Sequence, residues 1–292
     1  MKSKMLSRRM ALTTLVGFAA GSALARSAPP ANGIESIARL ERNIGGRIGF
    51  AALNTATKRW LSYRARERFA MCSTFKLILA AAILAKVDKA TLQLEQPVSF
   101  TRDEVLPNSP VGEAHPAGGS EPLKRMLQSM IEASDNTAAN RLLAMIGGPA
   151  RYTDYVRGMG DSTTRLDRME LELNSNQAGD ARDTTTPHAM VEDMQRILWG
   201  NWLSSNSLEL LMLWMRNSNG RNRLRAQLPA GWGAGDKPGT GPHGAVNDLA
   251  IFFPPKKPPI LVACYMSDSD SPTEVLEAAH GQIGALVALM MG

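Results

Sequence analysis

Residues 74–87 read TFKLILAAAILAKV and predict a nearly all-apolar helix. Ahead of this helix, residues 47–53 (RIGFAAL) and 58–63 (KRWLSY) predict two strands joined as a hairpin. Near the other end of the chain, residues 245–253 and 260–266 predict a second pair of apolar strands. The predicted sheet is therefore split between the two ends of the chain, and the apolar helix opens the segment between them.

The segment between the two strand pairs shows mainly helical patterns. Residues 122–132 and 136–146 predict amphipathic helices, and Thr186 followed by Pro187 predicts the start of another helix. A last helix is expected at 272–291, packed on the sheet. We therefore expect an α/β (α+β) fold, in which an antiparallel sheet is flanked by helices and an all-α subdomain is inserted.

The chain is expected to divide into three parts. Residues 1–25 begin with basic residues, continue into an apolar run and end at a small-x-small site, which is the pattern of a cleavable export signal. The apolar run is shorter than the roughly 20 residues that span a bilayer, so a stable membrane anchor is the weaker alternative. Residues 26–64 with 216–292 are predicted to form the α/β subdomain, and residues 65–215 the helical subdomain.

The leader also determines the expected location and much of the charge. Arg8 and Arg9 are similar to the twin-arginine export pattern, and export favours the periplasm. Without residues 1–25 the formal charge falls from +6 to +2, so no basic patch indicates nucleic acid as a partner. Cys72 and Cys264 lie far apart in the sequence and are expected to be free, buried thiols. A monomer is expected.

Ser73 and Lys76 stand at the start of the apolar helix, three residues apart, so both side chains lie on one helix face. A serine hydroxyl becomes a good nucleophile when a neighbouring base accepts its proton, and apolar surroundings lower the pKa of a lysine toward that task. Taken alone, the pair leaves open a helix-capping serine beside a lysine that reaches the surface.

The polar stretch at about 165–183 predicts an Ω-loop. Arg168 and Asp183 are placed to close its neck as an ion pair. Within the loop, Glu170 and Asn174 are placed to hold a water molecule, and solvated loop charges are the alternative reading.

Two further polar groups flank predicted elements. Ser134-Asp135-Asn136 lies between two predicted helices, where either helix capping or a cleft position accounts for these residues. Lys237 precedes Gly239, Thr240 and Gly241 at the start of an apolar strand. An ammonium group beside two glycines suits the close approach of an anionic ligand to the backbone.

Four motifs, Ser-x-x-Lys, Ser-Asp-Asn, Glu-x-x-x-Asn and Lys-x-Gly, follow one another in this order, and with them the chain resembles the class A serine β-lactamases. The resemblance extends over nearly the whole chain after the leader, including residues 134–140 and 183–187. It implies the fold shared with penicillin-binding proteins, with a five-stranded antiparallel sheet. It also implies hydrolysis of the β-lactam ring of penicillins and cephalosporins, which confers resistance.

The resemblance assigns a role to each motif residue. It implies that Ser73 attacks the lactam carbonyl, while the backbone N–H groups of Ser73 and Thr240 form the oxyanion hole. Lys76 or Glu170 accepts the serine proton, and Ser134 protonates the departing nitrogen. Glu170, assisted by Asn174, then activates the water that hydrolyses the ester. The residues implied to bind the substrate are Asn136, Arg223, Lys237, Gly239 and Thr240.

Two departures from common family usage concern the binding of the substrate carboxylate. Pro238 stands where the family carries serine or threonine, so a hydroxyl that helps to hold the carboxylate is lost. Val246 stands where many members carry an arginine, and Arg223 is expected to supply that charge instead.

Two other departures bear on substrate preference. In the carbapenem-hydrolysing subset, a cysteine before the nucleophile bridges to a second cysteine, whose place Gly241 takes here. Cys72 is then left without that bridge, and carbapenem hydrolysis is not predicted. Asn108 stands where the family often has an aromatic residue at the edge of the cleft.

Three other functions remain open at this point. A penicillin-binding transpeptidase or carboxypeptidase shares the serine and lysine but generally lacks the deacylating carboxylate that Glu170 supplies. A β-lactam sensor domain would need a membrane anchor, and a degenerate relative would have lost activity through Pro238. Neither a cofactor nor a metal is expected, because the histidines show no ligand spacing; they are His115, His188, His243 and His280.

Overall fold

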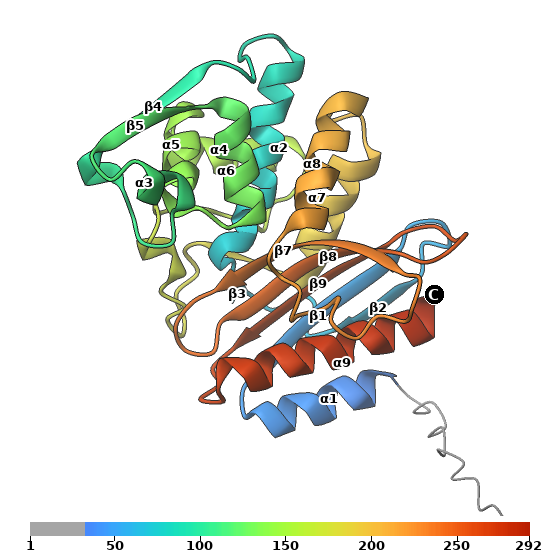
Figure 1. Cartoon of the computed structure of the whole chain (residues 1–292). Coiled ribbons are helices and arrows are strands. Elements are labelled where there is room, and N and C mark those ends of the chain that lie inside the picture. The colour runs from blue at the N-terminus through green and yellow to red at the C-terminus, as the bar shows by residue number, and fades with distance from the viewer. Residues whose placement is uncertain (1–32) are drawn as a thin grey trace, which may run out of the picture. The chain divides into compact units, whose positions relative to one another are not determined.

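A computed structural model describes residues 33–292. Its centre is a five-stranded sheet in the order β2-β1-β9-β8-β7, with every neighbouring pair antiparallel (Figure 1). The strands are β1 (Arg47–Asn54), β2 (Trp60–Tyr63), β7 (Gly233–Thr240), β8 (Val246–Phe253) and β9 (Ile260–Ser267). The predicted fold class is confirmed, and the sheet joins strands from both ends of the chain.

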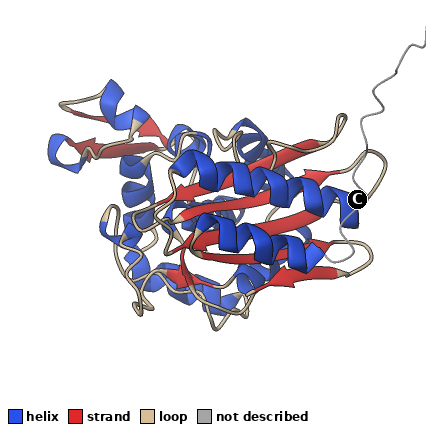
Figure 2. Ribbon diagram, turned by 90° about the horizontal axis from the view of Figure 1, so that it is seen from below, coloured by secondary structure: helices blue, strands red, loops and turns tan. Residues whose placement is uncertain are grey.

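Two helices cover one face of the sheet. They are α1 (Gly33–Ile44) and α9 (Thr273–Met291), which lie side by side across the strands (Figure 2). Ile37 of α1 and Ile283 of α9 pack with Phe50 and Val262 of the sheet in one apolar core. Because helices also cover the opposite face, all of β9 is buried, which explains why it reads as a continuous apolar run.

The opposite face carries the helices of the central segment. The apolar helix α2 (Phe75–Asp88) contacts all the larger helices of this segment, and its residues 75–85 are buried. The apolar composition of residues 75–85 follows from this central position, because no face of this part of the helix reaches water. The helices around it are α4 (Leu123–Glu132), α5 (Asn136–Met145), α6 (Gly148–Gly158), α7 (Pro187–Trp199) and α8 (Ser205–Asn217).

The smaller elements were not expected from the sequence. β3 (Phe69–Ala70) pairs with β6 (Thr184–Thr185), and β4 (Pro97–Thr101) pairs with β5 (Gly118–Pro122). The other short elements are the helix α3 (Pro110–Ala114) and 3-10 turns at Cys72–Thr74, Arg102–Glu104 and Glu172–Asn174. The pairing of β3 with β6 ties the C-terminal end of the Ω-loop region to the segment just before the nucleophile.

The elements predicted from periodicity are confirmed, including the hairpin of β1 and β2 and the Thr186 cap, whose side chain accepts the Ala189 N–H. Cys72 and Cys264 are both free and buried, as expected. The predicted export signal at residues 1–25 lies outside the described residues. The division into an α/β subdomain and an inserted helical subdomain stays a prediction.

Candidate active site

Ser73 lies in the 3-10 turn directly before α2. The turn is fixed from within, since Thr74 Oγ1 donates to the Met71 carbonyl at 2.8 Å. Ser73 is half-buried and faces a cleft of about 410 Å³. The same cleft is lined by six other predicted site residues, namely Ser134, Asn136, Asn174, Arg223, Gly239 and Thr240.

Lys76 lies behind the nucleophile and is fully buried. Its Nζ donates to the Ser134 carbonyl at 2.8 Å and to Asn136 Oδ1 at 2.7 Å, and it lies 2.9 Å from Glu170 Oε1. Burial lowers the pKa of Lys76, and the attraction of the Glu170 carboxylate only partly offsets this. The surroundings therefore push Lys76 toward the neutral amine that a proton acceptor needs.

Glu170 is the buried partner of Lys76 in the Ω-loop. Its Oε2 accepts a hydrogen bond from Asn174 Nδ2 at 2.6 Å. Its backbone is held by Asn140 of α5, which accepts from the Glu170 N–H at 2.9 Å and donates to its carbonyl at 3.0 Å. The peptide bond between Glu170 and Leu171 is cis. The carboxylate is thus fixed from both its side chain and its backbone.

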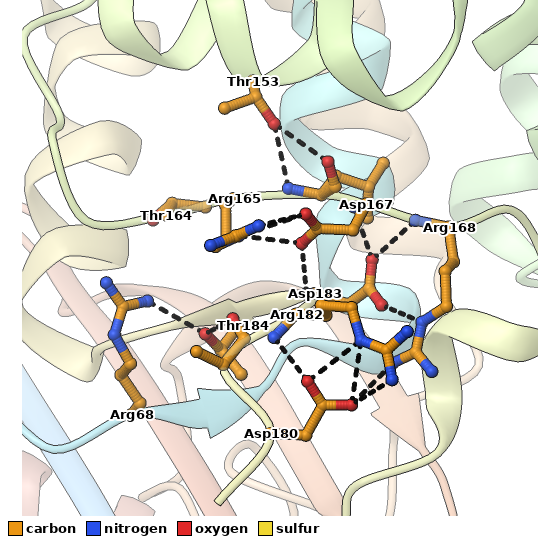
Figure 3. Close-up of polar contacts among 12 residues, drawn as sticks. Arg68, Thr153, Thr164, Arg165, Asp167, Arg168, Asp180, Arg182, Asp183 and Thr184 are labelled. Atoms are coloured by element: carbon orange, nitrogen blue, oxygen red, sulfur yellow. Dashed lines mark hydrogen bonds and ion pairs between the residues drawn. The ribbon is translucent and has the colours of Figure 1, made fainter.

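The neck of the Ω-loop is closed by the predicted ion pair (Figure 3). Arg168 Nε lies 2.6 Å from Asp183 Oδ2, and the carboxylate of Asp183 is fully buried. Asp183 Oδ1 also accepts the backbone N–H groups of Asp167 and Arg168, at 2.7 and 3.0 Å. Asp167 Oδ2 in turn accepts the Asp183 N–H at 3.0 Å. These bonds join the two ends of the loop that carries Glu170.

The opposite wall of the cleft is the edge strand β7. Lys237 is fully buried, and its Nζ donates to Ser134 Oγ at 3.1 Å and to the Pro238 carbonyl at 2.9 Å. Burial and then the positive charge of Lys76 lower the pKa of Lys237 well below its usual value. Ser134 Oγ contacts the side-chain nitrogens of both lysines, at 3.1 Å from Lys237 Nζ and 3.4 Å from Lys76 Nζ, and is therefore placed to relay a proton.

Gly239 allows β7 to approach the nucleophile closely. A Cβ atom at this position would lie 3.0 Å from the Ser73 nitrogen and 3.0 Å from the Met71 carbonyl oxygen. Next to it, Thr240 is held by Arg223, whose Nη2 donates to Thr240 Oγ1 at 2.7 Å. The contact confirms that Arg223 lies beside the predicted substrate-binding wall.

Comparisons with known proteins agree with this geometry. A family model described as the β-lactamase enzyme family matches residues 33–289. The carbapenem-hydrolysing β-lactamase KPC of Klebsiella oxytoca is 40% identical, over 85% of this chain and 86% of the relative. The β-lactamase CTX-M-6 of Salmonella typhimurium is 38% identical, over 84% and 86%.

The solved structures point the same way. An ancestral class A β-lactamase, GNCA, is 44% identical with a TM-score of 0.86, over 88% of this chain and 99% of that one. PenP of Rhodopseudomonas palustris, described as a putative class A β-lactamase, is 41% identical with a TM-score of 0.86, over 89% of this chain and 99% of that one. The chain belongs to the class A β-lactamases.

The two departures that concern the predicted carboxylate-binding wall are visible in the structure of this class A β-lactamase. Pro238 lies in the edge strand β7, opposite Asp248 of β8, and proline is tolerated at an edge because one side of the strand needs no N–H donor. Val246 is buried at the start of β8, while Arg223 lines the cleft. The sequence-based choice of Arg223 over residue 246 therefore fits the cleft of this β-lactamase.

The third departure leaves the cysteine before the nucleophile unbridged. A Cβ atom at Gly241 would lie 2.8 Å from Cys72 Sγ, so the two positions face each other directly. The same atom would lie 2.7 Å from the backbone oxygen of Asn174. Glycine at 241 thus leaves room for the Ω-loop beside the β7 wall of this β-lactamase.

Sequence reasoning missed two residues of the site. Asn140 holds the backbone of Glu170, and its signal was an asparagine inside a helix, where this residue is a poor helix former. Glu277 of α9 also lines the cleft, with its Oε1 3.2 Å from Arg223 Nε. Nothing in the local sequence around Glu277 marks it as a site residue.

Proposed function

We propose that this β-lactamase opens the lactam ring of penicillins and cephalosporins with Ser73 as nucleophile and Glu170 as the base for deacylation. The observation that carries the assignment is the buried contact of 2.9 Å between Lys76 and Glu170, directly behind the serine. Lys76 lies one helical turn after Ser73, and the Ω-loop brings the Glu170 carboxylate into contact with it, so the pair is suited to accept the serine proton.

In the acylation step, Ser73 Oγ attacks the lactam carbonyl carbon, and its proton passes to the Lys76–Glu170 pair. The negative charge on the carbonyl oxygen is held by the backbone N–H groups of Ser73 and Thr240. When the carbon–nitrogen bond breaks, Ser134 gives its proton to the nitrogen and is reprotonated through Lys76. The products of this step are a serine ester and an open ring that carries an N–H group.

In the deacylation step, Glu170 takes a proton from a water molecule that Asn174 helps to place. The resulting hydroxide attacks the ester carbon, and the proton returns to Ser73 Oγ as the acyl group leaves. Asn174 Nδ2 already donates to Glu170 Oε2, so both groups are oriented for the same water. The net reaction adds one water to the lactam amide.

The substrate is held at both ends of the cleft. Lys237, Thr240 and Ser134 are placed to bind its carboxylate, and Arg223 supports Thr240 and adds positive charge. Asn136 is held by Lys76 and by the Pro107 carbonyl, which leaves one N–H of its amide for the acyl side chain of the substrate.

The buried Glu170 carboxylate, held beside Lys76 and Asn174, favours hydrolysis over the action of a penicillin-binding transpeptidase. The test is to mix the purified protein with a chromogenic cephalosporin and to follow product formation and covalent mass together. We expect many turnovers per enzyme and no lasting adduct. One adduct per protein without turnover would contradict the assignment and favour a penicillin-binding or sensor protein.

We also propose that residues 1–25 direct export to the periplasm, through the twin-arginine route, and that the mature protein is a monomer. Among residues 33–292, no helix is both long enough and apolar enough to cross a membrane. The mass of the protein recovered from the periplasm tests the cleavage. It should equal that of a chain that begins after Ala25. Full-length protein in the cytoplasm alone would contradict this proposal.

A further inference from the structure

Glu277 places a carboxylate at one end of the cleft. It lies in the second turn of α9 and lines the same cleft as Ser73. Its side chain is 22% exposed, and its contact in the described part of the chain is the ion pair of its Oε1 with Arg223 Nε at 3.2 Å. Its other oxygen is therefore available to a ligand.

The positive partner of this ion pair is directed into the protein. Arg223 Nη1 donates to the Gly239 and Asn247 carbonyls, both at 2.7 Å, and Nη2 donates to Thr240 Oγ1. The Arg223 side chain is 8% exposed, against 22% for Glu277. A substituent that reaches this end of the cleft therefore meets the Glu277 carboxylate more directly than the guanidinium.

The chemistry of cephalosporins brings one substituent to this end. With the lactam carbonyl at Ser73 and the carboxylate at Lys237 and Thr240, the C3 substituent is attached to the ring carbon next to the one that bears the carboxylate. Beyond Thr240 the cleft is lined by Arg223, Glu277 and the exposed amides of Asn219 and Asn222. Carboxylate and amide oxygens attract a cation and offer little to an apolar group.

We propose that Glu277 is a specificity-determining residue that makes this enzyme prefer cephalosporins with a cationic C3 substituent over those with a neutral one. The inference rests on the proposed β-lactam hydrolysis and adds a substrate preference to it. Because each substrate carries the same ring carboxylate, the effect of Arg223 on that carboxylate is common to both classes, and the effect of Glu277 is not.

The test compares cephaloridine with cephalothin, which share one acyl side chain and differ at C3, where the first carries a pyridinium and the second a neutral acetoxy group. The kcat/KM ratio of the two substrates is measured for the native enzyme and for Glu277→Gln. We expect the substitution to lower the ratio about threefold or more, and added salt to lower the ratio of the native enzyme.

Glu274→Gln is the matched control. It removes the same charge from the first turn of the same helix, at an exposed position that does not line the cleft, and should leave the ratio unchanged. If Glu277→Gln changes kcat/KM for both substrates equally, Glu277 only supports Arg223 and the inference is wrong, while hydrolysis stands. If the native enzyme turns over neither substrate, the proposed function itself fails.

Discussion

At the scale of single residues, the chemistry depends on charges held out of water. Lys76, Glu170 and Lys237 are all buried around one half-buried serine, and their side chains are compensated by hydrogen bonds and by each other. Removing one partner from such a group leaves the others unpaired, which is costly in a low-dielectric site. The residues that touch the substrate from outside this group are more tolerant of change.

Pro238 is the residue whose replacement should improve the enzyme. Pro238→Thr restores a hydroxyl beside Lys237, and one hydrogen bond to a charged group is worth about 1.5–3 kcal/mol, so we expect KM for penicillins to fall roughly tenfold or more. Pro238→Val is the control, because it has the shape of threonine without the hydroxyl. An unchanged KM in Pro238→Thr would show that the missing hydroxyl does not limit binding.

The contacts of the site divide into those that sequence could predict and those that it could not. Ser73 and Lys76 are three residues apart on one helix, so their proximity follows from helix geometry alone. The contacts of Asn140 with Glu170 and of Arg223 with Glu277 join residues 30 and 54 positions apart. Such pairs depend on how the elements pack, and no local pattern records them.

At the scale of elements, the Ω-loop is held between three supports: the Arg168–Asp183 neck, the Asn140 clamp and the β7 wall at Gly241. Elements with a strong period or a cap were predicted correctly, such as α2 and α7. β5 was missed because its sequence, GGSEP, consists of residues that are rare in strands. The pairing of β5 with β4 stabilises the strand despite this composition.

Gly241 offers a direct test of this arrangement. Gly241→Cys should form a disulfide with Cys72 under oxidising conditions, because a Cβ at 241 lies 2.8 Å from Cys72 Sγ. Thiol titration of the unfolded, unreduced variant should then find one free thiol, that of Cys264, instead of three. The new Cβ also lies 2.7 Å from the Asn174 oxygen, so we expect deacylation to slow. Three titratable thiols would contradict the geometry.

At the scale of the whole molecule, the helices on the two faces of the sheet carry buried groups that titrate with opposite effects on stability: His280 lies in α9 and Asp193 in α7. Burial lowers the pKa of His280 to about 3, so the folded protein keeps it neutral while the unfolded chain binds a proton below about pH 6.5. Burial raises the pKa of Asp193 to about 8, so the folded protein holds a proton that the unfolded chain releases above about pH 4. Between about pH 4 and pH 6.5, the two groups change the free energy of unfolding in opposite directions by similar amounts per pH unit, so their pH dependences nearly cancel.

The substitution His280→Gln separates the contribution of His280 to the pH dependence of stability from that of Asp193. His280 Nε2 lies 3.0 Å from the Val246 carbonyl, and glutamine keeps a donor there but does not titrate. We expect the free energy of unfolding of the native protein, relative to the variant, to rise by about 1.4 kcal/mol per pH unit between pH 4 and 6. Denaturant unfolding across this range measures it. Parallel curves for the two proteins would show that His280 is not kept neutral by folding.

The central claim is that Ser73 is acylated and that Glu170 removes the acyl group, and the mass of Glu170→Ala during reaction with benzylpenicillin tests it most directly. The native enzyme should turn the substrate over without a lasting adduct. The variant should gain the mass of one penicilloyl group and keep it, because the serine is still present and the base for the water is gone. Release of product by Glu170→Ala at the native rate, with no adduct, would contradict the account.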